Sequence, residues 1–261
     1  MITKCIITTL AAGIITASAQ TTDNSFVGKW KMNPEKSQLS GLTYKIEDAG
    51  NDTYRLIFGD RAPETLAANG TEHKTQYGST WALRKTGANT WKFTQKRNGT
   101  VTSESEWTVS EDGKTFTSKV DVKRPDGSTS HNETVMKRTE GSGNGLAGTW
   151  ETSEEKIGSP AVLEVAKWGE DGYAISEPAF KDHLRVKTDG KDYPHEGPRV
   201  PKGSTASASK TGERELEVTN KLNGKTMNTE HYQLSEDGKT LTDTINFPGE
   251  SKQEVDVYER Q

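Results

Sequence analysis

Cysteine is nearly absent from this chain, because Cys5 is the only one in 261 residues. We expect Cys5 to be removed with an N-terminal targeting segment, so that the mature chain contains no cysteine. A chain without cysteine has no disulfide, no thiolate metal site and no cysteine nucleophile. Functions that depend on a thiol are therefore excluded for the mature chain.

Long apolar runs are also scarce, and the one example lies at the N-terminus. Lys4 precedes an apolar stretch from Ile6 to Ala17, and residues 17–19 (ASA) fit the small-x-small pattern of a cleavage site. The pattern predicts a signal peptide over residues 1–19 and a secreted or periplasmic mature chain. A transmembrane anchor is the alternative, but it needs about 20 apolar residues, and polar residues begin at Gln20. No other segment is apolar enough to span a membrane.

The chain has no excess of positive charge, since its formal net charge is −4. Lysines and arginines are spread along the sequence, so no basic footprint for nucleic acid exists. Only 30% of the residues are hydrophobic, but they alternate with polar residues. This period of two is typical of strands with one face toward a core and the other toward water.

The clearest positive feature is a repeated hexapeptide. Ser110–Thr115, with the sequence SEDGKT, recurs unchanged at Ser235–Thr240, an offset of 125 residues. Asp-Gly favours a tight turn, because Gly adopts positive φ without a steric penalty and Asp bonds its own backbone. Alternating residues flank both copies, so each predicts a β-hairpin at the same point of two repeats.

Other paired motifs extend the duplication over most of the chain. Gly28-x-Trp30 returns as Gly148-x-Trp150, and several turn sequences recur at similar offsets. We predict repeat one at 26–138, a Gly/Ser linker at 139–145 and repeat two at 146–261. Each repeat is expected to contain about eight to ten short antiparallel strands. The predicted fold is all-β, with two tandem meander barrels that hide their strand edges; a curved open sheet or sandwich is the alternative.

The two Gly-x-Trp segments resemble the first strand of calycins, the group that includes lipocalins and fatty-acid-binding proteins. In those proteins the Trp plugs the barrel floor and an Arg near the end of the domain packs over its ring. The resemblance implies this closing role for Trp30 with Arg138 and for Trp150 with Arg260. A guanidinium over an indole contributes roughly 0.5–2 kcal/mol.

Longer motifs resemble a group of secreted bacterial lipocalin-like proteins. The matching segments are Trp30–Ser37, Asp189–Pro194 and both hexapeptides. This resemblance covers nearly all of the mature chain and implies a lipocalin-like fold outside the cytoplasm, but it carries no activity. About ten residues separate Met32 from Leu42, too few for the helical lid of fatty-acid-binding proteins.

Four large side chains of repeat one align with smaller ones in repeat two. The pairs are Trp81/Ala206, Leu83/Ala208, Trp91/Leu216 and Phe93/Val218. The lost volume approaches the low end of the roughly 300–1,000 Å³ of ligand pockets. We therefore predict a pocket in repeat two, whereas the aromatic set of repeat one is interpreted as packed core. The predicted ligand-binding residues are Tyr173, Ala206, Ala208, Leu216, Val218 and Tyr232. Collapse of the sheet without a void is the alternative.

Recognised catalytic and metal motifs are absent from the sequence. His183 and His195 lie near three acidic residues and could form a metal or acid/base cluster, a solvated charged loop being the other interpretation. These acidic residues are Asp182, Asp192 and Glu196. No nucleophile elbow, phosphate-binding loop or dinucleotide fingerprint occurs. We predict no catalytic residue, no metal site and no cofactor.

The sequence leaves two main functional hypotheses and a third, weaker one. The first is a non-enzymatic, extracytoplasmic lipocalin-like protein that binds a small, partly apolar ligand. The alternative is a cell-envelope module that recognises a protein or glycan, with two weak sites gaining avidity from the duplication. A calycin-shaped hydrolase or isomerase is a third, weaker hypothesis. The protein partner is not identified by the sequence, and neither a nucleic acid partner nor a transmembrane segment is expected.

Overall fold

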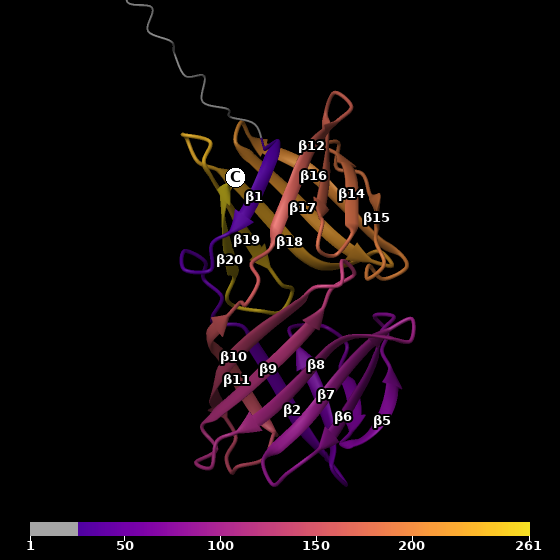
Figure 1. Ribbon diagram of the computed structural model, residues 1–261, viewed down its shortest axis with the longest axis vertical. Helices are drawn as coiled ribbons and strands as arrows, with labels where there is room; N and C mark the ends of the chain where they lie inside the picture. The colour runs from indigo at the N-terminus through magenta and orange to yellow at the C-terminus, as the bar shows by residue number, and fades with distance from the viewer. Residues whose placement is uncertain (1–25) are drawn as a thin grey trace, which may run out of the picture.

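The computed structural model describes residues 26–261, so the signal peptide predicted at 1–19 lies outside the described residues. Over the described range the chain folds into 20 strands and no helix. The strands form two ten-stranded antiparallel sheets, one closed into a barrel and the other nearly closed (Figure 1). The predicted all-β class with two antiparallel barrels is confirmed.

The lower barrel in Figure 1, here called the continuous barrel, is one unbroken stretch of chain. Its strands are β2 (Thr43–Gly50), β3 (Thr53–Phe58), β4 (Glu64–Ala67), β5 (Asn69–Lys74), β6 (Thr80–Lys85), β7 (Thr90–Arg97), β8 (Thr100–Val109), β9 (Thr115–Lys123), β10 (Thr129–Glu140) and β11 (Gly148–Lys156). The sheet order places β4 and β5 at its two edges. His73 on β5 bonds Glu64 on β4 at 2.8 Å, and this side-chain pair joins the edges.

The upper barrel, here called the discontinuous barrel, combines β1 with nine strands from the end of the chain. These strands are β1 (Gly28–Met32), β12 (Val162–Trp168), β13 (Gly172–Glu177), β14 (Asp182–Lys187), β15 (Tyr193–Glu196), β16 (Ser204–Gly212), β17 (Glu215–Leu222), β18 (Lys225–Leu234), β19 (Thr240–Asn246) and β20 (Glu254–Arg260). β1 pairs with β12 on one side and β20 on the other, which closes the sheet.

The barrels therefore do not coincide with the two sequence repeats. β1 opens the first repeat but lies in the second barrel, as the indigo strand among orange and yellow ones in Figure 1 shows. β11 opens the second repeat but lies between β10 and β2 of the continuous barrel. The continuous barrel is thus inserted in the chain between β1 and β12. The chain crosses between barrels at residues 33–42 and 157–161.

A local hairpin explains this exchange of first strands. Residues 141–147 turn the chain back so that β11 pairs with β10 directly. Closing this short loop costs less chain entropy than returning β1 from the far end of the repeat. Arg138 fixes the loop by donating hydrogen bonds to the carbonyl oxygens of Gly143, Gly145 and Ala147. Residues 139–145, expected to link two domains, instead belong to β10 and to this hairpin loop.

Both hexapeptides form the predicted hairpin turns, between β8 and β9 and between β18 and β19. In the first copy the Ser110 hydroxyl donates to Asp112 at 2.6 Å and accepts the Thr115 N–H at 3.0 Å. The second copy repeats these bonds at 2.7 and 3.0 Å. Gly113 and Gly238 have φ of +70° and +68°, the conformation that Gly adopts without strain.

Candidate functional site

Each barrel is plugged at one end by a Trp with an Arg over its ring. The Arg138 guanidinium carbon lies 3.9 Å from the Trp150 ring centroid, and that of Arg260 lies 4.2 Å from the Trp30 centroid. Both Trp side chains are fully buried. The expected pairing, each Trp with the Arg of its own repeat, is thus corrected, because the first strands are exchanged between the barrels.

The glycine of Gly-x-Trp makes room for this arginine. A Cβ on Gly28 would meet Nη1 of Arg260 at 2.6 Å, and Gly28 has a φ of +152°. Nε of Arg260 donates to the carbonyl oxygen of Gly238 in the hexapeptide turn at 2.6 Å. Arg138 makes the equivalent 2.6 Å bond to Gly113. The repeated hexapeptide therefore holds the arginine that closes each barrel.

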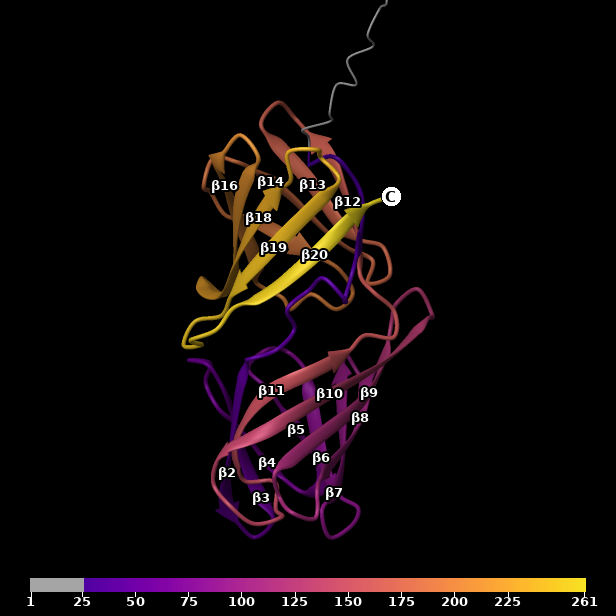
Figure 2. The same cartoon turned by 90° about the vertical axis from the view of Figure 1, so that its left-hand side faces the viewer.

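The two barrels are stacked end to end, as Figure 2 shows, and the ends opposite the Trp plugs face each other. The hexapeptide turns lie at the outer ends, and the turns at the other ends of β9 and β19 meet the opposite barrel. The Asp126 N–H donates to the carbonyl of Ala179 at 3.4 Å. The Glu250 carboxylate accepts the N–H groups of Thr43 at 3.1 Å and Gly59 at 3.0 Å. These bonds hold the two mouths against one another.

A cavity of about 910 Å³ lies between the two mouths and extends into both barrels. Its walls on the continuous barrel include Tyr44, Phe58, Arg61, Trp81, Phe93, Arg97, Trp107 and Phe116. Its walls on the discontinuous barrel include Glu177, Asp182, His195, Val218, Asn220, Glu230, Tyr232 and Glu254. The volume lies in the upper part of the roughly 300–1,000 Å³ range of small-molecule sites.

The structure separates the six residues predicted to bind ligand into two groups. Val218 and Tyr232 line the cavity. The other four lie in the packed core and are at most 4% exposed: Tyr173, Ala206, Ala208 and Leu216. The volume lost between the repeats is therefore filled near the plugged end and does not itself form the cavity.

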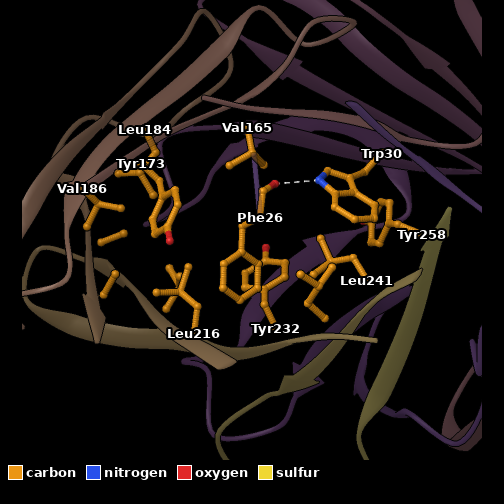
Figure 3. Packing of buried hydrophobic residues seen from close by; sticks show 14 of the residues in the cluster. Phe26, Trp30, Val165, Tyr173, Leu184, Val186, Leu216, Tyr232, Leu241 and Tyr258 are labelled. Carbon is orange, nitrogen blue, oxygen red and sulfur yellow. Dashed lines mark hydrogen bonds between the residues drawn. The ribbon is translucent and has the colours of Figure 1, made fainter. Parts of the chain in front are cut away.

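Phe26 belongs to the same buried cluster as Ala206 and Ala208 and lies at the centre of Figure 3. Its ring centroid lies 5.8 Å from that of Tyr173. In the continuous barrel the matching position is Leu146, since both residues accept the N–H of the plugging Trp at 2.9 Å. There Tyr54 packs instead against Trp91 at 6.3 Å. The core of the discontinuous barrel thus gains a large ring just before β1, where the continuous barrel has a leucine.

The continuous barrel contributes an aromatic wall, defined here as Trp81, Phe93, Trp107 and Phe116. Successive ring centroids lie 5.5, 4.8 and 5.5 Å apart. All four line the cavity. The interpretation of the aromatic set of repeat one as packed core holds for Trp91 and Phe93, which belong to the buried cluster, whereas Trp81 is only partly buried against it. Nε1 of Trp81 is buried without a hydrogen-bond partner, which leaves an unused donor in this wall.

The discontinuous barrel contributes an acidic wall, defined here as Glu230 on β18, Asp243 on β19, and Glu254 and Asp256 on β20. Asp243 and Asp256 face each other across adjacent strands, and they are 3% and 8% exposed. Glu230 and Glu254 line the cavity, whereas the buried Asp243 and Asp256 are not among its lining residues. Among the ion pairs found within residues 26–261, none involves these four carboxyl groups. The wall therefore gathers buried acids without neutralising cations.

Hydrogen bonds satisfy only part of the acidic wall. Glu230 accepts bonds from the side-chain amides of Asn220 and Asn228, at 2.8 and 3.1 Å, and from the Tyr232 hydroxyl at 2.7 Å. The Oδ1 atoms of Asp243 and Asp256 are buried and have no partner. A buried acceptor without a donor is uncommon in folded proteins and calls for an explanation such as a bound group.

Burial raises the pKa of the carboxyl groups around the cavity. It raises the pKa of Glu254 to about 7 and that of Asp256 to about 6, with nearby carboxylates adding to the effect. The pKa of Glu177 is likewise raised to about 7 by burial and by Asp182. Burial also raises the pKa of Glu230 and, strongly, that of Asp243. A cation in the cavity would favour the ionised form of all of them.

The matching positions of the continuous barrel are neutral. Ser105, Ser118 and Thr134 stand where Glu230, Asp243 and Asp256 stand in the other barrel. Ser118 faces Thr134 across β9 and β10, as Asp243 faces Asp256 across β19 and β20. Hydroxyl groups are therefore sufficient to build this part of the barrel, and the carboxylates are not a requirement of the fold.

The histidine–carboxylate cluster considered from the sequence as an alternative to a solvated loop is split by the structure. His195 and Asp182 line the cavity, but their nitrogen and oxygen are 3.9 Å apart, beyond hydrogen-bond distance. His183 pairs with Glu196 on the exposed face at 3.2 Å. The remaining member, Asp192, bonds Lys221. Burial lowers the pKa of His195. No group of three or more metal-ligating side chains is positioned for a metal within residues 26–261.

Sequence reasoning missed the acidic wall, although a signal for it was present. Glu230 precedes the inward-facing Tyr232 by two residues, and Asp256 precedes Tyr258 by the same interval. Asp243 follows Leu241 in the same way. Because a strand alternates its faces, these acids had to share the inward face. Acidic residues are rarely buried, so residue type alone assigns them to the solvated face.

Comparison with known proteins adds no family or activity to this geometry. No protein-family model and no curated protein matches the chain. Within residues 26–261 the structure contains no helix long and apolar enough to cross a membrane. The function is therefore argued from the cavity and its walls.

Proposed function

We propose that this protein is an extracytoplasmic, non-enzymatic binding protein of lipocalin-like type, which holds a small, partly apolar ligand in the cavity shared by its two barrels. The observation that carries the proposal is the cavity itself, with its volume of about 910 Å³ and its wall of four aromatic side chains. Concave sites of this size, largely apolar with a few polar groups, are typical of small-molecule binding.

The architecture supports a buried ligand rather than a surface partner. Trp30 and Trp150 plug the two outer ends, so the cavity lies at the inner junction of the barrels. Among the large hydrophobic side chains of residues 26–261, only Tyr44 is exposed, and it lines the cavity. The described surface thus offers no extended apolar patch for the alternative, an envelope module that recognises a protein.

A fluorescence titration tests the proposal. The chain from residue 20 onward is titrated with N-phenyl-1-naphthylamine, a neutral apolar probe that brightens in a dry site. We expect saturable uptake that is lost in Ser118→Trp and in Val218→Trp, because each fills the cavity from a different barrel. The controls are Thr117→Trp and Thr219→Trp, which place the same ring on the outer face of the same strands. Absence of uptake by the unmodified chain would refute the proposal.

A further inference from the structure

We infer that the ligand is a neutral molecule with a polar group at its centre and an apolar arm on each side, one arm in each barrel. This inference rests on the proposed function and specifies the chemical class of its ligand. The cavity extends into both barrels, and from either end its lining changes from apolar to polar toward the junction. A ligand with the same order of groups matches the cavity along its whole length.

Strand β7 shows this change in the continuous barrel. Because alternate residues of a strand face the same side, Phe93, Gln95 and Arg97 follow one another along its inner face, and all three line the cavity. Trp91, the preceding residue on this face, is fully buried and is not among the lining residues. Arg97 also lines a smaller cavity together with Arg199, from the loop before β16 of the other barrel, which places it at the junction. The aromatic wall is therefore deep, and the polar lining lies at the mouth.

The hairpin of β13 and β14 shows the same change in the discontinuous barrel. From the plugged end to the junction, its three inward cross-strand pairs are Tyr173 with Val186, Ile175 with Leu184, and Glu177 with Asp182. The first pair belongs to the buried core cluster that contains Trp30, whereas the other two pairs line the cavity. Just beyond the acidic pair, the carbonyl oxygen of Ala179 accepts the N–H of Asp126 from the other barrel. The polar end of this hairpin thus lies at the junction, with an apolar region behind it.

Side-chain amides and hydroxyl groups line the polar middle of the cavity. They include Gln95, Ser118 and Thr134 of the continuous barrel and Ser204, Asn220 and Asn228 of the discontinuous barrel. Asn220 and Asn228 donate to Glu230 at 2.8 and 3.1 Å, and within residues 26–261 no hydrogen bond to either amide oxygen is found. These groups offer both donors and acceptors to a ligand. A group such as an amide, which also has both, is therefore the expected centre of the ligand.

Charged groups of both signs surround this middle region. The lining includes the cations Lys45, Arg61, Arg97 and Lys221, the acids Glu64, Glu177, Asp182, Glu230 and Glu254, and His195. Lys221, for example, is engaged within the protein by a bond of 2.6 Å to Asp192. Burial raises the pKa of Glu177 and Glu254 to about 7, so at neutral pH both are in part uncharged. A charged ligand would lose its hydration without meeting a uniform counter-charge, whereas a neutral dipolar group avoids that cost.

Two isomers test where the polar group of the ligand lies. N-benzyl-2-phenylacetamide carries its amide between two benzyl arms, and 4-(2-phenylethyl)benzamide has the same atoms with the amide at one end. Isothermal titration calorimetry at pH 7 compares them on the chain from residue 20 onward. We expect the central amide to bind at least about tenfold more tightly, because the terminal amide either loses its hydrogen bonds in an apolar end or leaves one barrel empty. Equal affinities, or tighter binding of the terminal amide, would overturn the inference.

A third compound tests the neutrality of the centre. N-benzyl-2-phenylethylamine keeps both arms and replaces the amide with a secondary amine that is protonated at pH 7. We expect it to bind at least about tenfold more weakly than the central amide, because its charge must be desolvated. Equal or tighter binding of the amine would show that the carboxylates receive the ligand, and would contradict a neutral centre.

The variant Gln95→Leu/Asn220→Leu removes one amide of the lining from each barrel. We expect the central amide to lose about tenfold in affinity and most of its advantage over the terminal isomer. The control Thr94→Leu/Thr219→Leu places the same side chains on the outer faces of the same strands and should leave both affinities unchanged. A thermal melt verifies folding, and Gln95→Leu alone serves if Asn220, as a donor to Glu230, is needed for the fold. An unchanged advantage in the folded variant would overturn the inference.

The outcomes separate the proposed function from this inference. If the neutral probe N-phenyl-1-naphthylamine is taken up but the central amide has no advantage, the cavity binds ligand and the inferred class is wrong. If neither the probe nor any of the three compounds binds, the proposed function itself fails, and the inference fails with it.

Discussion

Arg260 lies over the indole of Trp30, 4.2 Å from the ring centroid, although the two residues stand at opposite ends of the described chain. This contact closes the discontinuous barrel and ties the first strand to the last. The equivalent contact between Arg138 and Trp150 joins residues that a single hairpin brings together. The continuous barrel is thus formed by one stretch of the chain, whereas the discontinuous barrel combines strands from both ends of the described residues.

Coupling between Trp30 and Arg260 is the first prediction. In a double-mutant cycle of Trp30→Leu and Arg260→Gln, measured by urea unfolding, we expect a coupling energy of about 0.5–2 kcal/mol. The reason is that each residue provides half of one cation–π contact. The matched cycle of Trp30→Leu with Arg138→Gln should be additive, because these residues belong to different barrels. A coupling energy between Trp30 and Arg138, with none between Trp30 and Arg260, would contradict the exchange of first strands between the barrels.

Gly28 should tolerate no side chain. Its φ of +152° is unfavourable for other residues, and an added Cβ would lie 2.6 Å from Nη1 of Arg260. We expect Gly28→Ala to reduce the free energy of unfolding by roughly 1–3 kcal/mol. Gly145→Ala is the control, because a Cβ there meets no atom within 4 Å. Equal stability of the two variants would argue against the arginine lying over the first strand.

Stability should fall as the pH rises from about 4.5 to 7. The pKa values of Glu177 and Glu254 are raised from 4.5 to about 7, and that of Asp256 from 3.8 to about 6. Between these limits the folded chain binds more protons than the unfolded chain, so each pH increment lowers the free energy of unfolding. His195 opposes the trend, since burial lowers its pKa, but it is one group against several carboxyls.

The measurement is a series of thermal melts without ligand. We expect a melting temperature at pH 5 that exceeds the value at pH 8 by about 3 °C or more, the shift that about 1 kcal/mol gives in a chain of this size. The variant Asp243→Ser/Asp256→Thr should narrow this difference by gaining stability at pH 8. A melting temperature that rises with pH would show that the acidic wall is ionised and stabilised in the empty protein.

Local features of the fold were predictable from the sequence, whereas the strand exchange was not. The hexapeptide fixes its turn through bonds among its own residues, such as that from Ser110 to Asp112. The exchange depends on which of two Gly-x-Trp strands pairs with which sheet. β1 and β11 carry the same pattern, so only the length and path of the connections decide between them.

The candidate site was predictable only in part, because it depends on how the barrels meet. Val218 and Tyr232 were expected to line a pocket and do so. Ala206 and Ala208 were expected there for their small size, but they lie buried in the core cluster that Phe26, just before the exchanged strand, also joins. The aromatic wall lines the cavity because the open ends of the two barrels face each other. The alternation of residues within one repeat does not predict how the two barrels are placed.

The central claim is that two barrels share one ligand-binding cavity, and native mass spectrometry tests it most directly. The chain from residue 20 onward, purified without denaturation, is mixed with an excess of 2-(1-naphthyl)ethanol. We predict one bound molecule per chain, lost in both Ser118→Trp and Val218→Trp and retained in Thr117→Trp and Thr219→Trp. Two bound molecules per chain, each lost with only one blocking variant, would show separate cavities, and a chain that binds none would contradict the account.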